Sequence, residues 1–231
     1  MSLFCIADPH LSFGCNKPMD IFKGWENYTD KLKENWNSIV TDKDTVVIAG
    51  DISWAMKLNE LKPDFDFIEN LNGKKILSKG NHDYWWETIK KLNNFVNEND
   101  YKTISFLHNN AFLINSTAIC GTRGWILENK NPSENDIKII SREACRLEAS
   151  VLQARKLSDS IVAFLHYPPV YDNYECESIL KILNDYNIKR CYYGHIHGKA
   201  AQYSVCGEYK NIDFNIISCD QVNFTPILVE L

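Results

Sequence analysis

The stretch that says most about the fold of this chain reads Lys75-Ile76-Leu77-Ser78-Lys79-Gly80-Asn81-His82-Asp83. It starts as a short apolar run, Lys75 to Ser78, which is typical of a buried strand. It ends in the tetrapeptide Gly-Asn-His-Asp, which arises by chance in roughly one in a thousand chains of this length and ordinary composition. The stretch therefore predicts a strand that ends in a chemically reactive loop.

Other apolar runs are followed in the same way by Asp or His. The segments that follow them are Asp8-x-His10, Gly50-Asp51, His166 and Gly194-His195-x-His197. In open α/β sheets the carboxyl ends of the strands line the ligand crevice, so we expect these segments to converge. Five of the six histidines lie in these strand-end segments. The sixth, His108, we interpret as a surface or capping residue.

Strand-like and helix-like segments alternate along the first half of the chain. The predicted strands are Leu3–Ala7, Thr45–Ala49, Lys75–Ser78, Ala111–Ile114, Ala118–Cys120, Ile161–Leu165 and Cys191–Tyr193. Helical spacing of apolar residues predicts helices around 28–39, 89–96 and 179–186, and Pro63 is expected in the first turn of another. Residues 201–230 become strand-like, which predicts an antiparallel closing portion. The pattern predicts an α/β layered fold.

The clearest helix is predicted over residues 134–157. Ser133 precedes it and Asp136 follows three residues later, which is a variant of the capping box. The apolar face that we assign to this helix consists of Ile137, Ile140, Ala144, Leu147 and Val151. We expect the helix to pack on the outside of the fold.

Length, composition and charge narrow the classes of protein. The chain has 231 residues, 45% hydrophobic and 24% charged, which predicts one domain over residues 1–231. The net charge is −5, which disfavours nucleic acid as a partner. No stretch approaches the roughly 20 apolar residues of a membrane span, so no membrane location is expected. Eight scattered cysteines without a CxxC pair favour free thiols and a cytoplasmic protein, and nothing points to an oligomeric state.

The side chains at the strand ends are those of a metal site. Imidazole and carboxylate groups together bind transition metals, and a carboxylate can bridge two cations. The candidate ligands are Asp8, His10, Asp51, Asn81, His166, His195 and His197. This set exceeds what one tetrahedral ion takes, so it favours two ions, with Mn, Fe, Zn or Ni as candidates. Two ions about 3.5 to 4 Å apart would activate a water and clamp the oxygens of a displacement at phosphorus.

These motifs resemble those of the calcineurin-like metallophosphoesterase family. The family pattern DxH, GD, GNH[DE], H and GHxH occurs here in the family order, between Asp8 and His197. The resemblance implies a single-domain, four-layer α/β/β/α sandwich with mixed sheets, and a metal-dependent hydrolase of phosphate mono- or diesters. It further implies the following assignment: Asp8, His10 and His197 bind one metal, Asn81, His166 and His195 bind the other, and Asp51 bridges them.

The resemblance also implies roles for the two residues that follow Asn81. His82 would contact the phosphoryl group and donate a proton to the leaving oxygen or stabilise its charge. Asp83 would orient His82 and fix its tautomer. The nucleophile would be a metal-bridging hydroxide, because a cation lowers the pKa of bound water towards neutrality.

The chain departs from the family pattern at the second motif. Many members extend it to GDxxD or GDxxN, whereas this chain has Trp54 at that position. The ligand Asp51 is kept, but a polar group is lost from the rim of the site, which puts substrate preference in doubt. Arg123, in Gly121-Thr122-Arg123-Gly124, is our candidate for a substrate-binding cation, with a salt bridge beside a turn as the alternative.

Aromatic side chains follow several of the motifs. Tyr84, Trp85 and Trp86 come directly after the Gly-Asn-His-Asp loop, where they would either wall the site or pack in the core. Core packing is the commoner fate of such residues, and Trp54 and Trp125 carry the same two interpretations.

Several functions stay open at this stage. We favour a small-molecule phosphomonoester or phosphodiester as the substrate, with a protein Ser/Thr phosphatase as the alternative, because the metal-binding residues do not separate these activities. A non-catalytic scaffold with the same fold is a second alternative, against which the complete ligand set counts. A single-metal sensor is a third.

Overall fold

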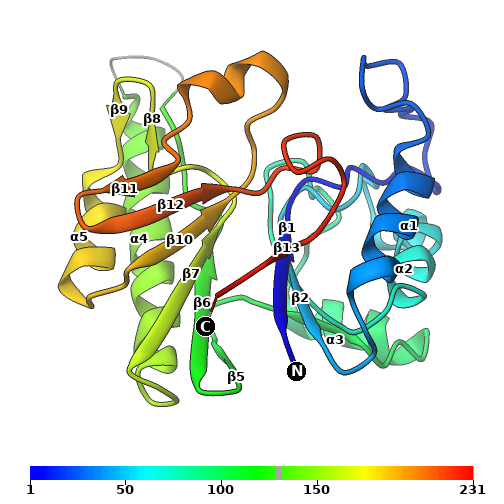
Figure 1. Cartoon of the computed structure of the whole chain (residues 1–231), viewed down its shortest axis with the longest axis horizontal. Coiled ribbons are helices and arrows are strands. Elements are labelled where there is room, and N and C mark those ends of the chain that lie inside the picture. Colours follow the sequence, from blue (N-terminus) through cyan, green and yellow to red (C-terminus); the bar gives the residue numbers. More distant parts are fainter. Residues whose placement is uncertain (128–131, 231) are drawn as a thin grey trace.

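The computed structural model describes residues 1–127 and 132–230 of the chain. Two β-sheets face each other in the middle of the molecule, and helices cover the outer face of each sheet (Figure 1). The predicted α/β fold, a four-layer α/β/β/α sandwich with mixed sheets, is confirmed.

The first sheet is built mainly from the N-terminal half of the chain. Within the described residues its strand order is β13-β1-β2-β3-β4. These strands are β1 (Leu3–Ile6), β2 (Thr45–Ala49), β3 (Lys74–Ser78), β4 (Ile104–Phe106) and β13 (Ile227–Leu228). Strands β1 to β4 run parallel, and β13 runs antiparallel to β1. The carboxyl ends of β1, β2 and β3 therefore meet at one edge of the sheet.

The second sheet has the order β11-β12-β10-β7-β6-β5 in the described part of the chain. These strands are β5 (Phe112–Ile114), β6 (Thr117–Thr122), β7 (Ser160–Leu165), β10 (Arg190–Tyr193), β11 (Gly207–Tyr209) and β12 (Ile212–Ile216). Strands β6, β7, β10 and β12 run parallel, while β5 and β11 pair antiparallel at the two edges. A small hairpin, β8 (Val170–Tyr171) and β9 (Tyr174–Glu175), and the short 3-10 helix Gly198–Tyr203 lie beyond the strand ends.

The expected antiparallel closing portion is only partly correct. Strands β11 and β13 are antiparallel to their neighbours, but β12 lies parallel to β10, with Cys191 paired with Phe214. The prediction failed because the direction of a strand depends on its partner, which the local pattern does not reveal. The consequence is that the end of β12 points to the same edge as the ends of β7 and β10.

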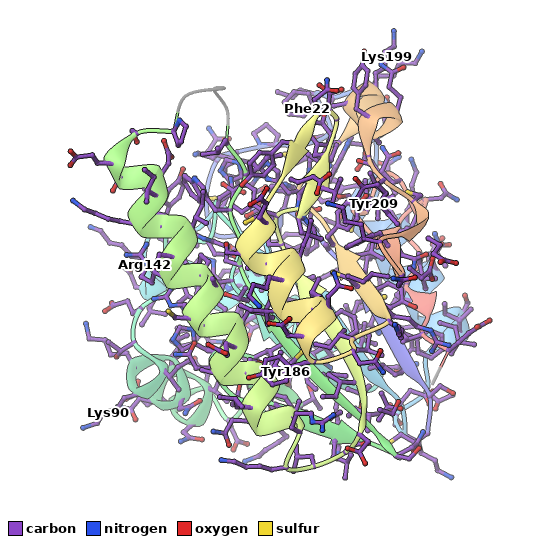
Figure 2. All side chains as sticks on the ribbon, turned by 90° about the vertical axis from the view of Figure 1, so that its left-hand side faces the viewer. Phe22, Lys90, Arg142, Tyr186, Lys199 and Tyr209 are labelled. Carbon is purple, nitrogen blue, oxygen red and sulfur yellow. The ribbon has the colours of Figure 1, made fainter. Side chains whose placement is uncertain are left out.

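Helices on the two outer faces complete the layers. The first sheet is covered by α1 (Tyr28–Ile39), α2 (Leu58–Glu69) and α3 (Ile89–Glu98). The second sheet is covered by α4 (Glu134–Ala154) and α5 (Glu177–Asp185), which lie side by side in Figure 2. Strands that are apolar on both faces suit this arrangement, because each sheet is buried from both sides.

Three apolar clusters fill the spaces between the layers. Phe4 and Ile6 of β1 pack with Trp36 of α1 and Phe65 of α2. Leu3 and Cys5 point the opposite way, into a cluster between the sheets that contains Phe164 of β7. This alternation follows from the two-residue period of a strand. A third cluster joins α4 and α5 to the second sheet through residues such as Leu147 and Leu183.

Two details of the helices differ from the predictions. Pro63 is the sixth residue of α2, beyond its first turn. The buried face of α4 consists of Ile139, Glu143, Leu147, Ser150, Val151 and Ala154, whereas the predicted face residue Ile137 is 56% exposed. The apolar pattern was misleading there because Glu143 and Ser150 are buried with hydrogen-bond partners. The capping box of Ser133 and Asp136 is present.

Candidate metal centre

The predicted convergence of strand ends is present. Asp8 and His10 follow β1, Asp51 follows β2, and Asn81 follows β3 from the first sheet, while His166 follows β7 and His195 and His197 follow β10 from the second. Two groups of side chains could each hold a metal ion, because within each group the ligand atoms lie within 4.8 Å of one another. These groups are Asp8, His10 and His197, and Asp51, His166 and His195. The site is therefore assembled between the ends of the two sheets.

The first group consists of Asp8, His10 and His197. Nε2 of His10 lies 3.3 Å from Nε2 of His197, so the two imidazoles face each other. Oδ2 of Asp8 accepts a hydrogen bond from the backbone N–H of His195 at 2.8 Å, and this contact joins the end of β1 to the end of β10. Trp25 packs edge-on against His197, with ring centroids 5.7 Å apart.

The second group centres on His166. Its Nδ1 lies 3.1 Å from the carbonyl oxygen of Ala49. A carbonyl oxygen can only accept a hydrogen bond, so Nδ1 carries the proton and donates it. Nε2 is then left as the free lone pair, 2.6 Å from Oδ1 of Asn81 and 3.4 Å from Oδ2 of Asp51. Second hydrogen bonds of this kind fix the orientation of metal-binding histidines.

Asp51 lies between the two groups. Its Oδ2 is 3.8 Å from Nε2 of His10 in the first group and 3.4 Å from Nε2 of His166 in the second. Its Oδ1 accepts a hydrogen bond from the backbone N–H of His82 at 2.7 Å. Its Oδ2 therefore faces an imidazole of each group.

The backbone is unusual where these side chains leave it. Asp8, His10, Asp51 and His195 all have positive φ angles, between 45° and 72°. Such conformations cost non-glycine residues free energy and cluster at functional sites, where the surrounding structure enforces them. At Gly80 a Cβ atom would stand 2.1 Å from Oδ1 of Asp51, so only glycine lets the β3 loop approach that carboxylate.

Burial sets the electrostatics of the centre. Desolvation raises the pKa values of Asp8 and Asp51, both almost fully buried, and for Asp8 the nearby Asp51 adds to the rise. Burial lowers the pKa of His166 to about 3 and that of His195 to about 2, which keeps both imidazoles neutral and able to bind metal.

Buried polar atoms of the site that lack hydrogen-bond partners indicate that it binds cations. Oδ1 of Asp8 and Nδ1 of His10 are buried without a hydrogen-bond partner in the described part of the chain. Buried polar atoms are normally satisfied, so each unsatisfied one requires an explanation. Paired carboxylates and neutral imidazoles without counter-charges are the donor set of transition metals, and the residues present fit such ions.

His82 lies at the open side of the centre. Its Nε2 is 4.0 Å from Oδ2 of Asp51, its side chain is 33% exposed, and its Nδ1 is buried without a partner in the described chain. The ring of Trp54 packs against it, with centroids 4.3 Å apart, and also stacks on His10 at 5.0 Å. Burial lowers the pKa of His82 despite the proximity of Asp51.

Asp83 does not make the contact expected of it. Its Oδ1 accepts hydrogen bonds from the backbone N–H groups of Ile52 and Ser53 and from Nε1 of Trp85, and its Oδ2 accepts one from the N–H of Gly80. No bond to His82 is among them within residues 1–127 and 132–230. The carboxylate is turned inward because four donors surround it, so Asp83 positions the loops after β2 and β3 and does not orient the imidazole of His82.

Asp220 belongs to the site although the sequence interpretation missed it. Its Oδ1 lies 2.7 Å from Nδ1 of His197, and its Oδ2 accepts a hydrogen bond from the backbone N–H of Gly198. Burial alone would lower the pKa of His197, but the bond to Asp220 and the charge of Asp8 raise it. The signal in the sequence is an acidic residue shortly after a strand-like segment, but only the parallel pairing of β12 with β10 brings Asp220 to this edge of the sheet.

Arg123 lies beside the second group. Its backbone carbonyl accepts hydrogen bonds from the N–H groups of His166 and Tyr167. Its guanidinium is 17% exposed, with Nη2 3.8 Å from a carboxylate oxygen of Glu143, and it stacks over Trp125. The structure thus shows the ion pair that was the alternative interpretation, in a position next to the metal-ligand candidates.

The remaining aromatic residues divide between core and rim. Trp85 and Trp86 are buried in the core cluster, as the commoner interpretation had it, whereas Tyr84 is 53% exposed. Trp54 and Trp125 are partly buried near the site. His108 is half-buried, with its ring 6.3 Å from that of Trp86.

All eight cysteines are free thiols, as expected, but only five are buried: Cys5, Cys120, Cys176, Cys191 and Cys219. Burial raises the pKa values of the Cys5 and Cys191 thiols, which argues against either as a nucleophile. Among the described residues, no helix has the length and apolar character that crossing a membrane requires.

The chain matches a known protein family over most of its length and one relative over part of it. The family model described as calcineurin-like phosphoesterase matches residues 1–199. An uncharacterized protein of Methanocaldococcus jannaschii is 30% identical over 130 residues, which are 54% of this chain and 66% of that protein. The match therefore spans just under two thirds of the length of that relative.

Solved structures share the fold at low sequence identity. A Thermus thermophilus protein has a TM-score of 0.58 and 12% identity, with 99% of this chain and 97% of that chain covered. The phosphopantetheinyl hydrolase of Mycobacterium tuberculosis has a TM-score of 0.56 and 16% identity, with 99% and 95% covered. A protein of unknown function from Aquifex aeolicus has a TM-score of 0.53 and 16% identity, with 98% and 95% covered.

Proposed function

The chain belongs to the calcineurin-like phosphoesterase family, and on that premise we propose that it hydrolyses phosphate mono- or diesters of small molecules at a dinuclear metal centre. The family makes the chain a metal-dependent hydrolase. The number of ions, their identity as Mn, Fe, Zn or Ni, and the class of ester are the parts that we propose.

The observation that carries the proposal is the position of Asp51. Two groups of ligand atoms lie side by side, and Oδ2 of Asp51 faces an imidazole of each. A carboxylate shared in this way suits two cations better than one. Asp8, His10 and His197 would hold one ion, Asn81, His166 and His195 the other, and Asp51 both.

The bound ions would supply Lewis acidity at phosphorus and make water a nucleophile near neutral pH. The protein supplies the rest. His82, whose Nδ1 has no partner in the described chain, would contact the phosphoryl group and give a proton to the leaving oxygen or stabilise its charge. The ring of Trp54 packs against its imidazole, and Oδ2 of Asp51 lies 4.0 Å from its Nε2. Asp83 keeps the loops in register, and Asp220 holds His197.

Arg123 is the proposed substrate-binding cation, because its backbone already joins the second ligand group and its guanidinium is partly exposed. The net charge of −5 argues against nucleic acid, and the buried free thiols suit a cytoplasmic protein. A protein Ser/Thr phosphatase is the alternative activity, and a non-catalytic scaffold is the alternative class.

Metal restoration of the stripped protein tests this function. Protein treated with a chelator is supplied with Mn, Zn, Ni, Fe or Mg one at a time, and hydrolysis of p-nitrophenyl phosphate and bis-p-nitrophenyl phosphate is followed. We expect turnover only with added metal, bound at two equivalents, and none in Asp51→Asn because that change removes the shared charge. Two bound ions without turnover of either ester would support the scaffold instead.

His82→Ala tests the role of the imidazole. We expect both metals to stay bound, because His82 donates only its backbone N–H to Asp51, while turnover falls by about a hundredfold or more. Tyr84→Phe, a change at an exposed neighbour, is the control. Full activity of His82→Ala would contradict the assignment.

A further inference from the structure

A small pocket of positive charge lies beside the second ligand group. It is bounded by the end of β3, the end of β6 and the middle of α4, and its charged lining consists of Lys79, Arg123, Glu143 and Arg146. The chain as a whole is acidic, so this concentration of cations is local. Three cationic side chains face a single carboxylate there.

That carboxylate is already fully engaged. Glu143 is 1% exposed, and its Oε2 accepts a hydrogen bond from the hydroxyl of Thr122 at 2.6 Å. Its Oε1 accepts one from Nη1 of Arg146 at 2.7 Å, and Arg123 stands 3.8 Å away. Glu143 therefore bonds closely to Arg146 and pairs with Arg123 only at a longer distance, so the three cations of the lining outnumber its one carboxylate.

The uncompensated donors can be identified. Nε of Arg123 is buried and has no hydrogen-bond partner, and Lys79 makes no side-chain hydrogen bond or ion pair within the described residues. A buried guanidinium N–H without an acceptor is costly, since charged donors lose the most when left unpaired. An anion at the mouth of the pocket would satisfy both side chains.

The metal-ligand candidates do not line the pocket, but two of its lining residues are joined to them through the backbone. Lys79 precedes Gly80 and Asn81 in the loop after β3, and the carbonyl of Arg123 accepts the N–H of His166. The enclosed space is about 20 Å³, which is enough for one water-sized atom. One oxygen of an anionic group therefore fits inside, and the remainder of the group would stay at the mouth.

We propose that this pocket binds a second phosphate group of the substrate, so that the enzyme acts on phosphate esters that carry two phosphates. The inference rests on the proposed function. A phosphate is favoured over a singly charged group because the fork of Arg123 and the ammonium of Lys79 together match a dianion with several acceptor oxygens.

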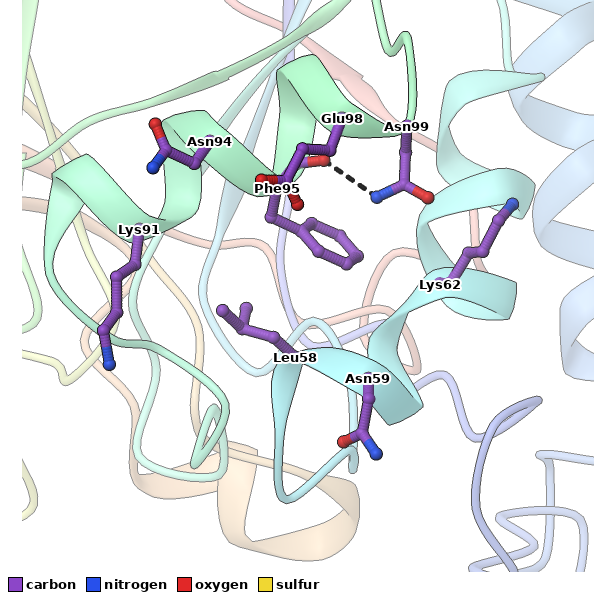
Figure 3. A pocket seen from close by; sticks show the side chains of 8 residues that line it. All are labelled: Leu58, Asn59, Lys62, Lys91, Asn94, Phe95, Glu98 and Asn99. Atoms are coloured by element: carbon purple, nitrogen blue, oxygen red, sulfur yellow. Dashed lines mark hydrogen bonds between the residues drawn. The ribbon is translucent and has the colours of Figure 1, made fainter.

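The larger groove on the molecule lacks these properties. It measures about 500 Å³ and lies between α2 and α3, with Leu58 and Phe95 pointing into it (Figure 3). Its two lysines are already paired, Lys62 with Asp66 and Lys91 with Glu87. It therefore offers no uncompensated charge to an anion.

Bisphosphonates of graded length test the proposal. Metal-loaded protein is titrated calorimetrically with alkane-1,ω-bisphosphonates of one to six methylenes and with alkylphosphonates of matched length. We expect one bisphosphonate length to bind about tenfold or more tightly than its monophosphonate. This gain should disappear in Arg123→Met and in Lys79→Met, and it should persist in Arg155→Met, whose arginine pairs with exposed Asp159.

The possible outcomes distinguish a failure of this inference from a failure of the proposed function. A gain that survives in both Arg123→Met and Lys79→Met would overturn the inference, because the second phosphonate would then sit on the metals. Equal weakening of mono- and bisphosphonates in these variants would also overturn it. Absence of metal-dependent hydrolysis of p-nitrophenyl phosphate by the unaltered protein would instead refute the proposed function. The two variants alter side chains that follow different strands, β3 and β6, so a folding defect in one leaves the other to decide.

Discussion

Asp220 follows His197 by 23 residues, yet its carboxylate oxygen lies 2.7 Å from the Nδ1 of that histidine. The contact makes Nδ1 the protonated nitrogen and leaves Nε2 free, in the direction of Asp8 and His10. Carboxylates placed behind a histidine in this way raise its basicity and fix its ring. Asp220 thus links the segment after β12 to the candidate metal centre.

Asp220→Ala should weaken metal binding by about 10- to 100-fold, because the imidazole of His197 loses its orientation and part of its basicity. Competition with a fluorescent metal indicator would measure the affinity of each ion. Asp159→Asn, which alters a carboxylate 95% exposed at the other end of the molecule, is the control. Unchanged affinity for both ions in Asp220→Ala would show that the contact has no part in metal binding.

At the scale of single helices and strands, local sequence patterns can assign a residue to the wrong face. In α4 the stripe that faces the sheet includes Glu143 and Ser150, whose side chains bond Thr122 and the carbonyl of Asn110. A rule that places apolar residues inside and polar residues outside assigns these two positions to the wrong face. The start of α4 was predictable, because the bonds between Ser133 and Asp136 are local, whereas the helix ends at Ala154 and not at the predicted Leu157.

Strand β3 carries a buried cation, which is another polar side chain that a simple inside–outside rule would place at the surface. Lys75 is fully buried. Its Nζ donates hydrogen bonds to the carbonyl of Glu69, the last residue of α2, and to the carbonyl of Leu71, two residues later. These carbonyls lack helical donors, so the ammonium completes the end of the helix. Burial nonetheless lowers the pKa of Lys75 to about 8.

The stability of the protein should therefore rise with pH through Lys75. Between pH 8 and about 10.4, the ordinary lysine pKa, the folded chain has lost the proton that the unfolded chain still binds, so higher pH favours the folded state. The free energy of unfolding of the unaltered protein should gain on the order of 1 to 3 kcal/mol over this window relative to Lys75→Met.

Urea unfolding at pH 7, 8.5 and 10 measures this difference. Lys74→Met, a change at the exposed neighbour on the same strand, is the control and should show no such trend. A pH-independent difference between the unaltered protein and Lys75→Met would contradict the assignment of the shift to this residue.

At the scale of the whole molecule, the candidate metal centre lies where the two halves of the fold meet. Asp8, His10, Asp51 and Asn81 extend from the first sheet, and His166, His195 and His197 extend from the second. Burial raises the pKa values of both carboxylates, Asp8 and Asp51. Bound ions would remove that cost and link the sheets.

Removal of metal should therefore lower stability. Each ion bound at a free concentration 100-fold above its Kd contributes about 2.7 kcal/mol to the free energy of unfolding. Chelator-treated protein should unfold at a lower urea midpoint than protein with Mn, and the gap should shrink in Asp51→Asn. Identical midpoints with and without metal would argue against ions bound within the folded centre.

The sequence by itself determined strands β1 to β3, β5 to β7 and β10, the four layers implied by the family motifs, and the strand ends at which the ligand candidates lie, but it missed β4. These features depend on short-range patterns: apolar runs, local capping and motifs a few residues long. Only the tertiary structure decided that β12 lies parallel to β10, that Asp220 reaches His197, and that Asp83 turns away from His82. It also placed Arg123 against Glu143. Each of these depends on which segments become neighbours after distant strands pair, and a pairing partner far along the chain leaves no local trace in the sequence.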